Sequence, residues 1–85
     1  MAVALTSYQV QVLVDANDGL FPHDTDEWAA SQGDIQMLMG LGLVEMTDEG
    51  DLIPSGDGSA VVARILAQDF DVVPNGGQIL HVFNV

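Results

Sequence analysis

Apolar residues recur at helical spacing near the start of the chain. Val10, Leu13 and Val14 follow one another at intervals of three and one, which places them along one side of a helix. Thr6 and Gln9 fit a capping box, in which each side chain bonds to the other residue's backbone N–H. The pattern therefore predicts a first helix that ends at the turn residues Asn17, Asp18 and Gly19.

Two further helices are predicted before the middle of the chain. Asp24, with Glu27 three residues later, begins the second helix, which carries Trp28 on its inner face and ends at Gly33. Asp34 is the predicted cap of the third helix. Its apolar face is made of Ile35, Leu38, Met39 and Leu41.

A short hairpin and a fourth helix come next. Residues 43–46 and 52–54 are predicted strands, and the turn between them is Asp48, Glu49, Gly50 and Asp51. Ser55 or Asp57 caps the fourth helix, and both alternatives are open. The predicted core face of this helix consists of Val61, Val62, Ile65 and Leu66.

The last segment, residues 69–85, is predicted to be a second hairpin with its turn at Pro74-Asn75-Gly76-Gly77. Its final strand is largely apolar on both faces: Ile79, His81, Phe83 and Val85 on one side, and Leu80, Val82 and Asn84 on the other. A strand that is apolar on both faces needs cover on both. We therefore expect the tail to pack against another chain, or residues 2–5 to pair beside it.

These elements predict a single α+β domain over residues 1–85. It comprises a small body of three to four helices with a β-hairpin wing, followed by the C-terminal hairpin as an interaction element. The residues predicted to contact a partner are Arg64, Phe70, Val72, Ile79, Leu80, His81, Val82, Phe83 and Val85.

The charge of the chain limits the classes of partner that it can bind. Thirteen acidic residues stand against one basic residue, Arg64, which gives a formal charge of −12. Phosphate backbones and anionic membranes are bound through Lys and Arg, so both partners are disfavoured. Solubility, a basic protein partner and imitation of DNA's charge all remain open as reasons for the acidity. The acidic patch is predicted at Asp24, Asp26, Glu27, Glu45, Asp48, Glu49 and Asp51.

Three short motifs carry a family resemblance: Gly-Leu-Val-Glu at 42–45, Asp-Glu-Gly at 48–50, and Pro-Ser-x-x-Gly at 54–58. Over residues 5–68 the chain resembles the winged helix-turn-helix regulators of the MarR and PadR families. The resemblance implies a third helix that enters the major groove and a wing that touches the DNA backbone. Here the third helix carries Asp34 and Gln36 and the wing is acidic. We therefore expect the fold without direct DNA binding.

No catalytic, cofactor-binding or metal site is predicted. With no cysteine, disulfides and thiolate sites are impossible. His23 with Asp24 and Asp26 makes a weak metal site, because no second histidine lies nearby. His81 is predicted to be half-buried; at an interface, it would make association pH-dependent. No apolar run approaches the ~18 residues that span a bilayer, and residues 1–5 are too short for a signal peptide.

The sequence thus predicts a non-enzymatic interaction or structural subunit, a homo-oligomer or part of a larger assembly, either intracellular or in a virion. An accessory protein of a phage or viral capsid is its concrete form. Two alternatives stay open: an acidic DNA mimic that inhibits a nucleic-acid-binding protein, and a winged-helix regulator that acts through a partner.

Overall fold

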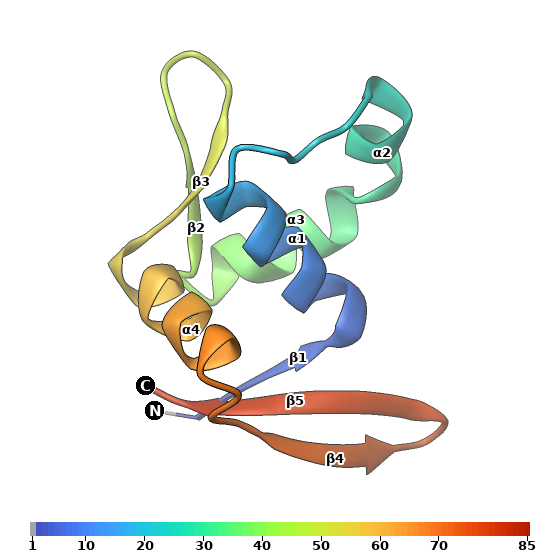
Figure 1. Cartoon of the computed structure of the whole chain (residues 1–85). Helices are drawn as coiled ribbons and strands as arrows, with labels where there is room; N and C mark the ends of the chain where they lie inside the picture. Colours follow the sequence, from blue (N-terminus) through green and yellow to red (C-terminus); the bar gives the residue numbers. More distant parts are fainter. Residues whose placement is uncertain (1) are drawn as a thin grey trace.

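A computed structural model describes residues 2–85 as four helices and five strands, and confirms the α+β class. The elements are β1 (Ala2–Thr6), α1 (Ser7–Asn17), α2 (Thr25–Ala30), α3 (Gln32–Gly40), β2 (Val44–Met46), β3 (Leu52–Pro54), α4 (Gly56–Leu66), β4 (Asp71–Asn75) and β5 (Gln78–Asn84). The helices lie on one side of a three-stranded sheet, and the β2–β3 hairpin, here called the wing, projects away from that sheet (Figure 1).

The sheet has the antiparallel order β1-β5-β4. Its first strand, β1, pairs with β5 in the register Val3↔Phe83 and Leu5↔His81. Of the two arrangements expected for the tail, pairing beside the N-terminal segment is therefore the one observed. Gly76 and Gly77, both at positive φ, make the tight turn between β4 and β5.

The core lies between the helices and the helix-facing side of the sheet. β1 and β5 contribute Val3, Leu5 and Phe83, and the remaining core side chains come from α1, α3, α4, the wing and the adjoining connectors. Its most buried apolar members are Val3, Leu5, Val12, Leu13, Leu38, Leu43, Val61 and Phe83. Since alternate strand residues face opposite sides, Val3, Leu5 and Phe83 fix which side of the sheet is covered.

Local capping agrees with the sequence at three of the four helices. Thr6 and Gln9 form the predicted capping box of α1. Asp24 caps α2 by accepting from the Glu27 N–H at 2.7 Å, and Ser55, rather than Asp57, caps α4. Each cap satisfies a backbone N–H that has no partner inside its helix.

The third helix differs from the prediction at its start. It begins at Gln32, so Gly33 lies inside α3 instead of ending α2. Ser31 lies at the α2–α3 junction, and its hydroxyl is bonded to Tyr8 instead of capping the helix. Asp34 occupies the first turn of α3, where its carboxylate accepts a hydrogen bond from Gln9 Nε2 at 3.2 Å.

Two residues predicted to face the core, Leu66 and Met39, do not, whereas Trp28 packs against the core as predicted. Leu66 is 74% exposed and Met39 is also exposed, while Trp28 is half-buried and packs against Phe21. Leu66 is the last residue of α4 and lies about a quarter-turn beyond the stripe formed by Val61 and Ile65. The helix ends before any other element covers that side.

Candidate interaction surface

The C-terminal hairpin exposes part of the apolar set predicted for partner contact. β4 and β5 run beneath the helices, and their tip extends past the helical layer (Figure 1). Val72 and Ile79 are 57% and 53% exposed on the helix-facing side of the tip, and Val73 is 43% exposed on the opposite side. Leu80 and Val82, on the central strand, are half-buried.

Phe83, predicted as a contact residue, belongs instead to the chain's own core. Its side chain is fully buried, and its ring lies 5.3 Å from that of Phe70. Phe70 and Val85 pack against the same core and are partly buried. Pairing with β1 places Phe83 beside Val3, on the side of the sheet that faces the helices.

His81 lies on the helix-facing side, opposite Leu5. Its ring centroid is 5.3 Å from that of Phe70, and its Nδ1 atom is buried without a hydrogen-bond partner among residues 2–85. A buried polar atom without a partner costs stability. The Nδ1 atom is thus covered by the chain itself.

Arg64, the single basic residue of the sequence, is engaged within the chain. Its Nη1 forms an ion pair with the Asp69 carboxylate, and its backbone carbonyl accepts a hydrogen bond from the Asp69 N–H at 2.9 Å. Both side chains are largely exposed, so the pair contributes at most about 1 kcal/mol. Of the two roles open for Arg64, the intrachain pair is the one observed.

The predicted acidic patch lies on elements far from the sheet. Asp24, Asp26 and Glu27 belong to the start of α2, and Asp48, Glu49 and Asp51 to the wing turn. Both elements project from the end of the molecule opposite the three-stranded sheet (Figure 1). All of these carboxylates are exposed except Glu27, which is half-buried, and Glu45 is exposed on β2.

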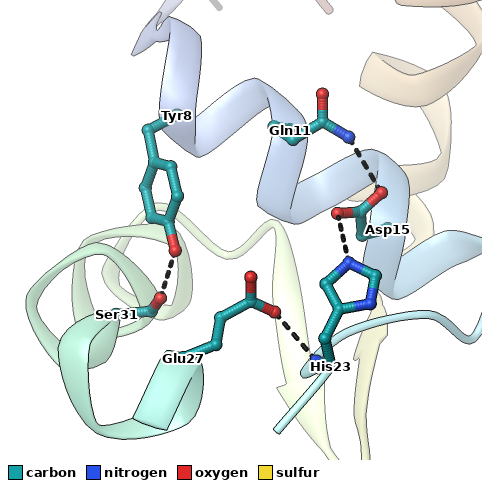
Figure 2. A network of polar contacts seen from close by, with 6 residues as sticks. All are labelled: Tyr8, Gln11, Asp15, His23, Glu27 and Ser31. Atoms are coloured by element: carbon teal, nitrogen blue, oxygen red, sulfur yellow. Dashed lines mark hydrogen bonds and ion pairs between the residues drawn. The ribbon is translucent and has the colours of Figure 1, made fainter.

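A polar network that the sequence did not predict ties α1 to the following connector (Figure 2). Asp15 accepts a hydrogen bond from Gln11 Nε2 at 2.8 Å and lies 3.8 Å from His23 Nε2. The His23 N–H donates to Glu27 Oε1 at 2.9 Å. The Glu27 side chain therefore bonds the N–H of His23, one residue before the N–H of Asp24 that a complete capping box would use.

The network also contains the side-chain hydrogen bond between Tyr8 and Ser31, which joins α1 to the α2–α3 junction (Figure 2). Gln11 and Asp15 are four residues apart on one helix, so their contact is readable from sequence. Tyr8 and Ser31 are 23 residues apart, and no local pattern brings them together. These contacts position backbone elements, and nothing in the network places a nucleophile beside a base.

Within residues 2–85, no pocket is found, and no group of three or more His, Cys, Asp or Glu side chains is placed to hold a metal ion. None of the helices in that range is both long and apolar enough to cross a membrane. No protein-family model, curated protein or solved structure matches the chain.

Proposed function

We propose that this protein is a non-enzymatic interaction subunit of a larger assembly and that its sheet is the contacting element. The observation that supports this most is the apolar hairpin, on which Val72, Val73 and Ile79 are all more than 40% exposed. Large aliphatic side chains gathered on one element of a small domain are typical of protein contact sites. An accessory position on a phage or viral capsid is the concrete form of the proposal.

The order of α1 to α4, with the wing between α3 and α4, supports a winged-helix-like body as part of this proposal. Direct DNA binding is not part of it. In a DNA-binding winged helix, the third helix and the wing meet phosphate, whereas here α3 carries Asp34 and the wing carries Asp48, Glu49 and Asp51. Carboxylates at these positions repel a phosphate backbone.

Size-exclusion chromatography with light scattering tests the proposal on the full chain at about 50–500 µM, the range in which weak interfaces form. The monomer mass is 9.0 kDa. A discrete species at a multiple of this mass supports a subunit role. A mass of one chain throughout that range contradicts self-assembly.

A DNA-mimic inhibitor is the second candidate, favoured by the exposed carboxylates on the wing and at the start of α2. Such a protein would bind a basic nucleic-acid enzyme in a salt-sensitive manner. Under this reading, the triple change Asp48→Asn, Glu49→Gln and Asp51→Asn abolishes binding to that enzyme. Under the subunit reading, the same variant keeps the mass of the unmodified chain, since the wing lies away from the sheet. Light scattering of the unmodified chain and of the triple variant, each alone and mixed with that enzyme, separates the two roles.

A further inference from the structure

One face of the three-stranded sheet has no helix against it (Figure 1). Val3, Leu5 and Phe83 point into the core, so their neighbours in each strand point the other way. The register sets Thr6, Leu80 and Val73 in one row across the sheet, and Ala4, Val82 and Asp71 in the next. We call this side of the sheet the outer face; it consists of Ala2, Ala4, Thr6, Asp71, Val73, Asn75, Gln78, Leu80, Val82 and Asn84.

The outer face has the layout of a protein interface. Its centre is apolar and consists of Ala4, Val73, Leu80 and Val82. Polar residues surround this centre: Thr6, Asp71, Asn75, Gln78 and Asn84. An apolar centre with a polar rim is the usual anatomy of a surface that contacts another protein.

The distribution of charge indicates which partner fits. Asp71 is the one acidic residue on the three strands of the sheet, out of thirteen in the chain. A basic partner would be drawn to the acidic wing and α2, where most of the attraction lies. A second copy of this chain, itself carrying −12, approaches with least repulsion through the face that is nearly free of charge.

β4 is an edge strand of the sheet, and its free edge is poorly suited to pairing with another strand. The pair Asn75 and Gln78 flanks the two-residue turn and is hydrogen-bonded. The next pair, Pro74 and Ile79, is therefore not hydrogen-bonded, so the backbone groups of Pro74 point away from β5, towards the free edge. Pro74 has no N–H to donate from that edge. Association through the face is therefore favoured over addition of a strand at β4.

We propose that two copies of the protein pack outer face to outer face, with Leu80 and Val82 at the centre of a two-fold interface between three-stranded sheets. This deepens the proposed subunit role and rests on it. A two-fold axis lets one self-complementary patch serve both copies. Two sheets packed in this way interdigitate their side chains about 10 Å apart.

The size of the face sets the strength of the dimer. Three strands spaced about 4.8 Å apart, with lengths of up to seven residues, cover roughly 300 Å² in projection. A stable interface buries about 800 Å² on each partner. We therefore expect a reversible dimer with a dissociation constant on the order of 10–100 µM.

Sedimentation velocity on the full chain between about 5 and 500 µM tests the proposal, because this range brackets the expected constant. The test variant is Val73→Thr with Leu80→Thr, which keeps strand propensity and places hydroxyls in the apolar centre. The matched control is Met37→Gln with Leu66→Gln, which removes two exposed apolar side chains from α3 and α4, outside the outer face. Thermal unfolding of both variants establishes that they are folded at the measuring temperature.

The expected result is a dimer for the unmodified chain and for the control, and at least a tenfold weaker dimer for the outer-face variant. A dimer that survives the outer-face substitutions overturns this inference but leaves the subunit role standing. A dimer lost only in the control also overturns it and assigns the contact to the helices. A monomeric unmodified chain contradicts both the dimer and self-assembly.

Discussion

Gly58 shows how a single residue determines the packing of an element. It lies in the first turn of α4, and an added Cβ would come within 1.8 Å of the Leu43 carbonyl oxygen. The same carbonyl accepts a hydrogen bond from the Ser55 N–H at 2.9 Å. The start of α4 is therefore held directly against the backbone that enters the wing, and only glycine leaves room for that approach.

Gly58→Ala is expected to destabilise the fold by about 1–3 kcal/mol or more, because either the carbonyl or the helix must move. Gly33→Ala is the matched control: Gly33 lies in the first turn of α3, and its added Cβ would meet nothing within 4 Å. This control is expected to be neutral or to stabilise by up to about 1 kcal/mol. Urea unfolding of both variants measures the difference. Equal stabilities would contradict the packing described for α4.

At the scale of elements, the Tyr8–Ser31 hydrogen bond connects α1 to the α2–α3 junction. Ser31 is fully buried, whereas Tyr8 is partly exposed. Tyr8→Phe leaves the serine hydroxyl without this partner, and we expect a loss of about 1–3 kcal/mol.

A double-mutant cycle with Ser31→Ala isolates the contribution of this bond. Once the hydroxyl is gone, removal of the tyrosine oxygen should cost little, so the double variant is expected to lose less than the sum of the two single losses. Denaturant unfolding of all four proteins measures the coupling. Additive losses would show that the bond does not join these helices.

Local signals predicted most elements, and contacts between distant residues account for the differences. The Thr6–Gln9 box, the Ser55 cap and the glycine turns depend on a few adjacent residues, and each is present. The start of α3 was missed because Tyr8 engages the Ser31 hydroxyl from another helix. A strand apolar on both faces does not reveal which face is covered, so the core position of Phe83 required the register with β1.

At the scale of the whole molecule, the acidic patch and the three-stranded sheet lie at opposite ends. The acidic wing and the start of α2 project from one end, and the nearly uncharged sheet forms the other (Figure 1). The two candidate roles use different ends: a DNA mimic acts through the carboxylates and a subunit through the sheet. The response to salt distinguishes them, because salt screens charge interactions while leaving apolar burial in place.

The most direct test is the mass of the full chain in about 0.1 M and about 1 M sodium chloride, at one concentration near the expected dissociation constant. Two copies of a protein with a formal charge of −12 repel each other, and high salt screens that repulsion. We predict that the dimer persists in 1 M salt and that the fraction of chains in the dimer is at least as large there as in 0.1 M salt. A complex that dissociates in high salt, or a mass of one chain in both conditions, would contradict association through the outer face.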